Sequence, residues 1–194
     1  SIGKKGIKLI DVPGVGESGD RDKEYAQLYN NLLPKLDAIL WVLKGDDRAF
    51  SSDEVFYKNI VRPYIKDGVP FFMVINQVDK IEPFREWNEE SKEPGARQSK
   101  NIREKRHAVA GFFELPLDKV IPVSANEKYN LIELMDSIIF SLPREKRFPT
   151  LKAAPKDNIS DAAKDTAETG FLEEIVGFIL KHIITTIPGP LGPI

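Results

Sequence analysis

FFMVINQVDK, residues 71–80, joins a run of five apolar residues to a polar turn. A short, continuous apolar run bounded by turn residues is typical of a strand buried on both faces, as in a parallel sheet. Gly68 and Pro70 end the preceding segment and mark the start of this strand. The polar residues from Asn76 to Lys80 therefore follow the carboxyl end of a strand, which is where open parallel sheets bind their ligands.

Other segments have the same apolar character. Ala38–Leu43 (AILWVL) is almost continuously apolar, and we predict a central parallel strand covered on both faces. Lys119–Val123 (KVIPV) predicts another strand, and Gly6–Val12 (GIKLIDV) predicts a buried strand that ends at a Pro-Gly turn.

Apolar residues at helical spacing lie between and after these strands. The spacing predicts helices over Arg21–Leu33, Ser51–Tyr64 and Leu131–Leu142, and a basic amphipathic helix over Ile102–Phe113. Glu82–Lys100 is polar, contains two prolines and a glycine, and is interpreted as a surface insertion. Strands that alternate with helices at these lengths imply right-handed crossovers and an α/β fold with a mostly parallel sheet.

The composition excludes several classes of function. Of the 194 residues, 28 are basic and 30 are acidic, so no global positive field favours nucleic-acid binding. The chain has no cysteine, which excludes thiol catalysis and thiolate metal sites and suits a reducing, cytoplasmic location. His107 and His182 are too far apart to form a local metal motif. No basic segment followed by an apolar one indicates a secretion signal.

The sequence changes character after Pro143. Residues 148–169 are rich in alanine, lysine, aspartate and proline and predict a linker or a loosely packed helix. Residues 170–194 predict an apolar helix followed by a tail rich in proline and glycine. The helix contains Glu173, Glu174 and Lys181 and is short for a bilayer span. We therefore expect intramolecular docking or self-association instead of membrane association.

Asp11-Val12-Pro13-Gly14 follows the predicted strand nearest the N-terminus. A carboxylate at this position can hold Mg²⁺, usually through water, and a glycine lets a backbone N–H approach a terminal phosphate closely. A strand that leaves through a Pro-Gly turn explains the same residues without any ligand. This motif alone leaves both interpretations open.

Asn76-Gln77-Val78-Asp79-Lys80 follows the strand FFMVI. The Asp79 carboxylate can accept hydrogen bonds from the N1–H and the exocyclic amine of guanine, donors that adenine does not present in that arrangement. Asn76 would brace the loop. The alternative is a polar turn with a helix N-cap.

Val123-Ser124-Ala125-Asn126 follows the strand KVIPV. Small side chains at this position let a backbone N–H reach the O6 atom of guanine. A helix N-cap explains the Ser-Ala pair equally well, so the value of this motif comes from its place after a strand.

The order DVPG, NQVD and SA, each after a strand, makes the chain resemble the Era-like, translation-factor-related P-loop GTPases. Among these it is similar to the bacterial GTPases of the YfjP/YeeP type, whose domain is often labelled ribosome-binding. The resemblance covers about Gly6–Leu142 and implies a three-layer G domain within residues 1–147, with a C-terminal helical extension. It implies GTP or GDP and Mg²⁺ as cofactors, with Asp11 also as metal ligand, and no residue is assigned a catalytic role. The implied nucleotide contacts are Asp11, Val12, Pro13, Gly14, Asn76, Gln77, Asp79, Lys80, Ser124, Ala125 and Asn126.

The chain departs from the family pattern in two main ways. Gln77 stands where the NKxD motif usually has a lysine that packs over the base, so we expect weaker nucleotide affinity. No GxxxxGK[ST] occurs in the chain; the family places this P-loop and the first strand before Ser1. We therefore interpret the chain as a truncated G domain and expect it not to hydrolyse GTP efficiently by itself. Val15 and Gly16 follow Gly14, so no glutamine stands there to position an attacking water.

The leading hypothesis is a GTP-binding, GTP-hydrolysing switch. The alternatives are a non-catalytic pseudo-GTPase remnant that acts as an interaction module, and a ribosome- or RNA-associated factor regulated by nucleotide. The basic segment Arg97–Arg106 (RQSKNIREKR) is a candidate RNA or ribosome contact. No aromatic residues interleave with its charges, so a solvated helix face is the favoured interpretation.

Overall fold

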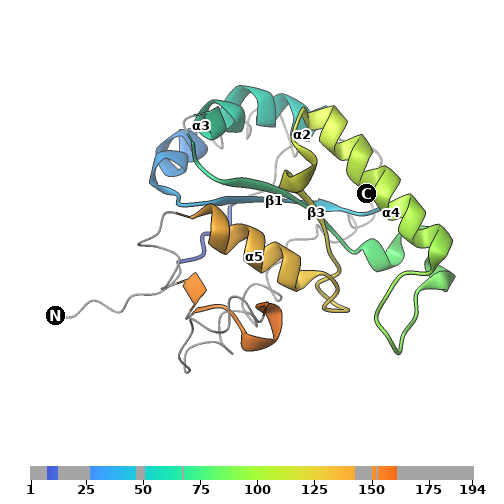
Figure 1. Ribbon diagram of the computed structural model, residues 1–194. Coiled ribbons are helices and arrows are strands. Elements are labelled where there is room, and N and C mark those ends of the chain that lie inside the picture. The colour runs from blue at the N-terminus through green and yellow to red at the C-terminus, as the bar shows by residue number, and fades with distance from the viewer. Residues whose placement is uncertain are drawn as a thin grey trace, which may run out of the picture. The chain divides into compact units, whose positions relative to one another are not determined.

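The computed structural model describes residues 8–12, 27–46, 51–66, 68–142, 150–151 and 153–160. The chain divides into two compact units, which are Val12–Asn130 and the combination of Ser1–Asp11 with Leu131–Ile194. The first unit contains the sheet, whose arrangement is shown in Figure 1.

Three parallel strands form the sheet: β1 (Ile39–Lys44), β2 (Phe71–Asn76) and β3 (Val120–Pro122), in that order. The register pairs Lys44 with Asn76 and Ile75 with Pro122. Because the strands are parallel and in register at their ends, their carboxyl ends meet at one edge. Every residue of β2 is buried, which explains its continuous apolar sequence.

Helices cover one face of the sheet. Residues 27–32 are helical and continue into η1 (Leu33–Lys35), a 3₁₀ turn. One helical run then follows β1 and consists of α2 (Ser51–Phe56), the π-helical turn η2 (Tyr57–Val61) and α3 (Arg62–Lys66). Figure 1 shows this run and α4 (Ala96–Phe113) on the same side of the sheet. The remaining 3₁₀ turns are η3 (Val78–Lys80), η4 (Phe84–Glu86), η5 (Leu117–Lys119) and η6 (Lys156–Asn158).

An aromatic cluster joins the helical run to the sheet and to the end of α4. The ring of Tyr57 in η2 lies 5.4 Å from the ring of Phe71 in β2 and 5.4 Å from the ring of Phe113 in α4. All three side chains are buried. Burial of such a ring contributes roughly 2–3 kcal/mol, so this cluster is a main tie between α4 and the sheet.

Exposed ion pairs link the end of α4 to the same helical run. Glu114, the residue that ends α4 in a left-handed conformation, accepts a hydrogen bond of 2.7 Å from the Arg62 guanidinium. The Lys58 ammonium lies 3.6 Å from the other carboxylate oxygen of Glu114 and 2.7 Å from Glu54. The hydrogen bond from Arg62 lowers the pKa of Glu114 below its ordinary value, so this carboxylate is charged at neutral pH.

The described residues do not fully match two of the predicted strands. β1 lies at one end of the three described strands and Val42 is 41% exposed, so the described residues do not cover this strand on both faces, and its central place stays a prediction. An apolar run favours a strand but does not fix its place in a sheet. Residues 8–12 form no strand, because a strand needs a hydrogen-bonded neighbour and no described segment pairs with them. Gly6 and Ile7, where this strand was predicted to begin, lie outside the described residues.

The second unit contains α5 (Leu131–Ser141), which matches the predicted helix within one residue. Met135 and Ile139 of α5 are buried in a cluster with Leu151, Ala154 and Ile159. These last residues belong to the predicted linker, of which residues 161–169 lie outside the described part. The predicted apolar helix and tail, residues 170–194, also lie outside it. Among the helices that are described, none has the length and apolar character to cross a membrane.

Candidate functional site

Loops that follow β1 and β2 contact each other at the carboxyl edge of the sheet. The backbone N–H of Gly45 donates a hydrogen bond of 2.7 Å to the carbonyl of Asn76. A Cβ atom on Gly45 would lie 3.0 Å from that carbonyl oxygen and 3.1 Å from the carbonyl oxygen of Gln77. Glycine is therefore the residue that permits this close approach.

Asn76, the last residue of β2, connects its own loop to the loop after β3. Its side chain is buried, and its Oδ1 atom accepts the backbone N–H of Gln77 at 2.8 Å and that of Ala125 at 3.1 Å. The backbone N–H of Val78 adds a bond of 3.2 Å to the carbonyl of Val123. The structure therefore brings the NQVD and SAN segments together through the asparagine that the sequence singled out.

The NQVD segment forms a tight turn. Gln77 has φ of 62°, a left-handed conformation that is uncommon for a residue with a side chain. Its carbonyl accepts the N–H of Lys80 at 3.0 Å, and its side-chain oxygen lies 3.4 Å from the Lys80 ammonium. Asp79 stands within this turn, and its Oδ1 atom is buried without a hydrogen-bond partner among the described residues. A buried carboxylate oxygen without a donor is costly and is chemically suited to accept one from a ligand.

The SAN segment is a narrow hairpin turn. The backbones of Ser124 and Tyr129 exchange two hydrogen bonds, at 3.2 and 2.9 Å. The Ser124 hydroxyl accepts the N–H of Glu127 at 3.2 Å, so it caps this turn and not the start of a helix. Ala125 is buried and Asn126 is exposed. The N–H of Ala125 is already bonded to Asn76, which leaves the N–H of Asn126 as the next donor along the turn.

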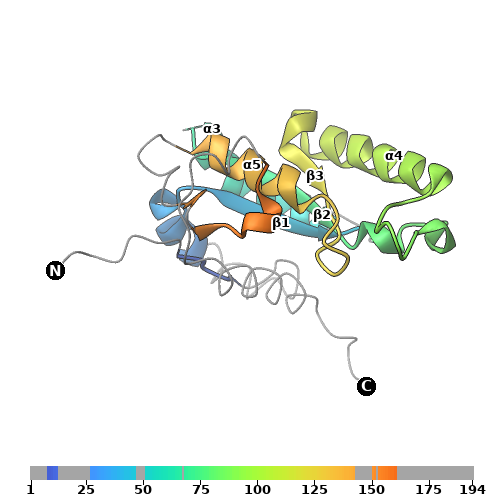
Figure 2. The ribbon, with the colours of Figure 1, turned by 60° about the horizontal axis from the view of Figure 1, so that its bottom comes forward.

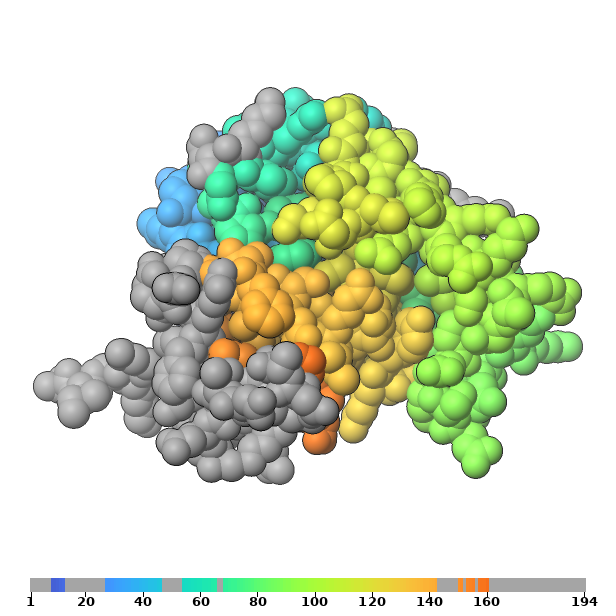
Figure 3. Space-filling model, in the orientation of Figure 1, coloured from blue at the N-terminus to red at the C-terminus, as the bar shows by residue number. Residues whose placement is uncertain are grey.

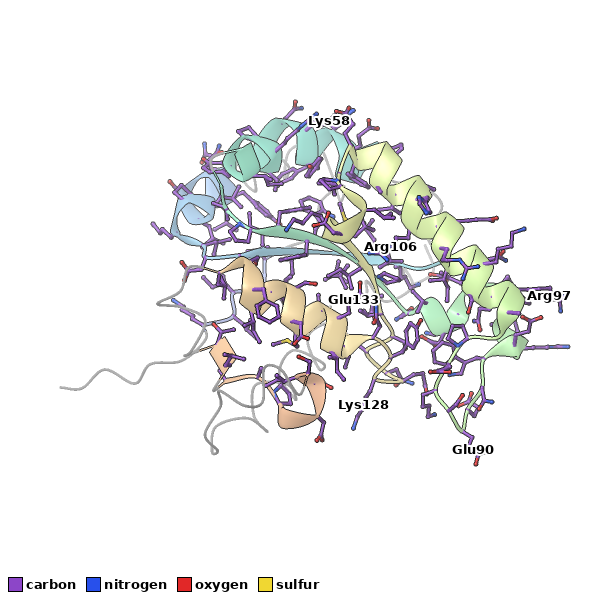
Figure 4. All side chains as sticks on the ribbon, in the orientation of Figure 1. Lys58, Glu90, Arg97, Arg106, Lys128 and Glu133 are labelled. Atoms are coloured by element: carbon purple, nitrogen blue, oxygen red, sulfur yellow. The ribbon has the colours of Figure 1, made fainter. Side chains whose placement is uncertain are left out.

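The segment Glu82–Gly95, here called the arm, projects beside the start of α4, as Figures 2 and 3 show in green. An antiparallel bridge between Asn88 and Glu93 narrows it, and Figure 4 places Glu90 at its tip. The Lys92 ammonium lies 2.6 Å from the Glu127 carboxylate in the SAN turn. The hydrogen bond from Lys92 lowers the pKa of Glu127.

An aromatic contact joins the arm to the SAN turn a second time. The rings of Trp87 and Tyr129 meet edge to face, with centroids 5.5 Å apart. The arm therefore begins after the NQVD turn, contacts the SAN turn through Trp87 and Lys92, and continues into α4. Sequence reasoning missed Trp87, Lys92 and Glu127, because nothing in their local pattern indicates which distant residue each one meets.

A cavity of about 290 Å³ lies between the arm and the two turns. It is lined by Asp79, Lys80, Phe84, Trp87, Glu89 and Glu127. Trp87 Nε1 is buried and, like Asp79 Oδ1, has no hydrogen-bond partner among the described residues. The aromatic rings of Phe84 and Trp87 and the acceptor on Asp79 form a site suited to a flat heterocycle that carries N–H donors.

The start of α4 also differs from prediction, since the helix begins at Ala96 and not at Ile102. The Glu86 carboxylate accepts the N–H of Arg97 at 2.9 Å and that of Gln98 at 3.3 Å, and it pairs with the Arg97 guanidinium. Gly95 allows this contact, because a Cβ on it would lie 2.7 Å from the Cβ of Glu86. The hydrogen bond from Arg97 lowers the pKa of Glu86. Because Glu86 lies 11 positions before Arg97, this cap leaves no N-cap pattern in the sequence.

Only the first two residues of the DVPG motif lie within the described part of the chain. Asp11 is exposed, and Val12 is half-buried against the core of the first unit. Pro13 and Gly14 lie outside the described residues. Within the described part of the chain, no group of three or more His, Asp or Glu residues is close enough to hold a metal ion.

Acidic partners neutralise part of the basic segment Arg97–Arg106. Arg97 pairs with Glu86, and Lys100 lies 3.6 Å from Glu104 on the next turn. Arg106 donates to the carbonyl of Leu117 at 3.0 Å. Figure 4 labels both Arg97, at the start of α4, and Arg106, in its second half. Arg97 and Lys100 thus have acidic partners within the protein, and both the solvated helix face and a ribosome or RNA contact stay predictions.

The chain is similar to proteins of Escherichia coli K12. It is 37% identical to YfjP over 195 residues, which cover all of this chain and 65% of YfjP. It is 30% identical to YeeP over 174 residues, which cover 82% of this chain and 72% of YeeP. A more distant similarity, at 28% identity over 206 residues, is to the GTPase Era of Aquifex aeolicus, with 96% of this chain and 58% of Era aligned. The chain thus spans less than two thirds of YfjP. No family model and no solved structure matches it.

Proposed function

Because this chain belongs to the YfjP/YeeP family of Era-like P-loop GTPases, we propose that it is the guanine-reading part of a GTP-binding switch. The single observation that carries this proposal is that Asp79, a residue that lines the cavity, has a buried Oδ1 atom with no hydrogen-bond partner among the described residues. Guanine presents the N1–H and the exocyclic amine side by side, and one carboxylate can accept both. Adenine offers no such pair.

The neighbouring turns would position the base. Asn76 fixes the two turns to each other, so the carboxylate of Asp79 and the SAN turn keep a constant separation. Since Asn76 already accepts the N–H of Ala125, the donor proposed for guanine O6 is the N–H of Asn126. Ser124 and Ala125 act through the backbone of their turn. The motif alone did not indicate that the N–H of Ala125 already has an acceptor.

Gln77 would hold the base less firmly than the lysine of the NKxD motif. Its side chain is buried and contacts the Lys80 ammonium at 3.4 Å. A neutral amide gives no charge-assisted hydrogen bond to a phosphate-binding loop. We therefore propose weak nucleotide affinity for this family member compared with one that carries the lysine.

Phosphate and Mg²⁺ binding is proposed for the DVPG segment. The exposed Asp11 side chain supplies a carboxylate oxygen, the ligand type that Mg²⁺ prefers, and Mg²⁺ normally keeps several waters, so one carboxylate is chemically sufficient. Gly14 would admit a backbone N–H near the γ-phosphate. Bound Mg²⁺ would neutralise phosphate charge.

Base selectivity is the sharpest test of this proposal. The chain, labelled with ¹⁵N, is titrated with GMP and with AMP at millimolar concentration while amide signals are followed by NMR. We expect GMP to shift the amides of Asp79, Ala125 and Asn126, and AMP to leave them in place. Equal shifts with both nucleotides would contradict guanine reading by Asp79.

Measurements of GTP affinity and of GTP hydrolysis distinguish a GTP-hydrolysing switch from a non-catalytic pseudo-GTPase. The sequence contains no GxxxxGK[ST], so we expect this chain to show little GTP affinity in calorimetry and no measurable GTP hydrolysis. Low-micromolar binding of GTP would contradict the expectation that tight binding requires a GxxxxGK[ST] motif in addition to the DVPG segment. Hydrolysis by a longer chain that adds such a motif would favour the switch over a non-catalytic interaction module.

A further inference from the structure

Gln98, in the first turn of α4, holds the backbone of the NQVD turn. Its side chain has no exposed surface, and its Nε2 atom donates to the carbonyl of Asp79 at 2.8 Å and to the carbonyl of Ile81 at 2.9 Å. These carbonyls lie on either side of Lys80. One amide group therefore fixes the path of the backbone that carries the Asp79 side chain.

The other half of the same amide is unsatisfied. Gln98 Oε1 is buried and has no hydrogen-bond partner among the described residues. A buried polar atom without a partner destabilises a fold, and an apolar side chain of similar shape would avoid that cost. Such a side chain would leave the carbonyls of Asp79 and Ile81 without this donor, so the glutamine holds the turn in place at the cost of its own unpaired oxygen.

The start of α4 is itself held in place. The carboxylate of Glu86 accepts the backbone N–H groups of Arg97 and Gln98, and Gly95 brings the arm into contact with the helix start. Asn101, one turn further along, donates from its side chain to the carbonyl of Glu82 at 2.7 Å. The arm, the helix start and the NQVD turn form one hydrogen-bonded unit, with Gln98 as the member that reaches Asp79.

We infer that Gln98 is a positioning residue for guanine selectivity, a role that rests on the proposed function of Asp79. Its hydrogen bonds set where the Asp79 carboxylate stands relative to the guanine amine. A shift of the turn by a fraction of an ångström spoils a two-donor contact more than it spoils stacking, because hydrogen bonds weaken steeply with distance and angle.

The test compares GMP with IMP, which lacks the exocyclic amine. Three proteins are titrated by NMR: the wild-type chain, Gln98→Met, and Asn101→Leu as the matched control. Gln98→Met keeps the side-chain length and removes both donors to the NQVD turn. Asn101→Leu removes an amide-to-carbonyl bond on the same helix that does not involve Asp79. We expect Gln98→Met to lower the ratio of GMP to IMP affinity by about tenfold, and Asn101→Leu to leave it unchanged.

The ratio of GMP to IMP affinity separates a positioning effect from a general loss of stability, since a loosened fold weakens the binding of GMP and of IMP equally. A wild-type ratio of one would overturn the proposed function and this inference together. A preserved ratio in Gln98→Met, with a selective wild type, would overturn this inference alone. If Gln98→Met does not fold, Glu86→Ala is tested in its place, because it removes the cap that joins the arm to the start of α4. We expect this variant to lower the ratio of GMP to IMP affinity about threefold, and an unchanged ratio would overturn the inference.

Discussion

Asn76 and Ala125 are 49 positions apart in the chain, and the Oδ1 atom of Asn76 accepts the backbone N–H of Ala125 at 3.1 Å. The bond crosses from the end of β2 to the turn after β3. It is buried, so water cannot replace it. The geometry of the proposed base site therefore depends on a side chain that does not itself touch the cavity.

Asn76→Ala should destabilise the chain by about 1–3 kcal/mol, because the N–H groups of Gln77 and Ala125 would lose their acceptor inside the protein. Chemical denaturation measures the change. Asn88→Ala is the matched control, since Asn88 also accepts two backbone N–H groups but is exposed. We expect its effect to stay below about 1 kcal/mol, and an equal loss in both variants would contradict the importance of burial.

Asp79→Asn should change the preferred base from guanine to xanthine. The asparagine amide donates where the carboxylate accepted, and xanthine carries a carbonyl in place of the exocyclic amine. We expect the ratio of GMP to XMP affinity to fall at least about tenfold in NMR titrations. An unaltered preference in Asp79→Asn would refute the assignment of this turn.

Gly95→Ala and Gly111→Ala should have opposite effects on stability. A Cβ on Gly95 would lie 2.7 Å from the Cβ of Glu86 and 2.8 Å from its carbonyl oxygen, so we expect a loss of about 1–3 kcal/mol. Gly111 is in α4 with nothing within 4 Å of its Cβ position, so alanine there should stabilise by about 0.5–1 kcal/mol. Thermal denaturation of the wild-type chain and of both variants measures these changes in stability. A tolerated alanine at Gly95 would show that the arm can move away from the helix start.

The Lys92–Glu127 pair should be visible in a carboxyl titration. The hydrogen bond from Lys92 lowers the pKa of Glu127 from its ordinary value of 4.5, so the ionised form favours the folded chain above pH 4.5. That contribution is lost as the pH falls through the lowered pKa. Carboxyl-carbon NMR should find a pKa below 4.5, and Lys92→Met should raise it. An identical pKa in both proteins would mean that the pair does not form in solution.

The sequence predicted the elements whose signal is local. β2, β3 and α5 follow from apolar runs and helical spacing, and Asn76 and Asp79 stand out because they come directly after a strand. The start of α4 was misplaced because its cap, the Glu86 carboxylate, comes from another segment. Gln98 gave no signal at all, since a glutamine in a basic helix has the pattern of a solvent-exposed residue although it has no exposed surface.

Buried contacts and exposed ion pairs both hold α4, and the two kinds of contact respond differently to salt. At Gln98 the contacts are buried hydrogen bonds, which dissolved ions do not reach. At Glu114 the tie to Arg62 and Lys58 is partly exposed and electrostatic, so it weakens once the Debye length shrinks to a few ångströms at about 1 M salt. Concentrated salt should therefore weaken the ion pairs of Glu114, while the buried ring of Phe113 and the buried hydrogen bonds of Gln98 keep both ends of α4 against the first unit.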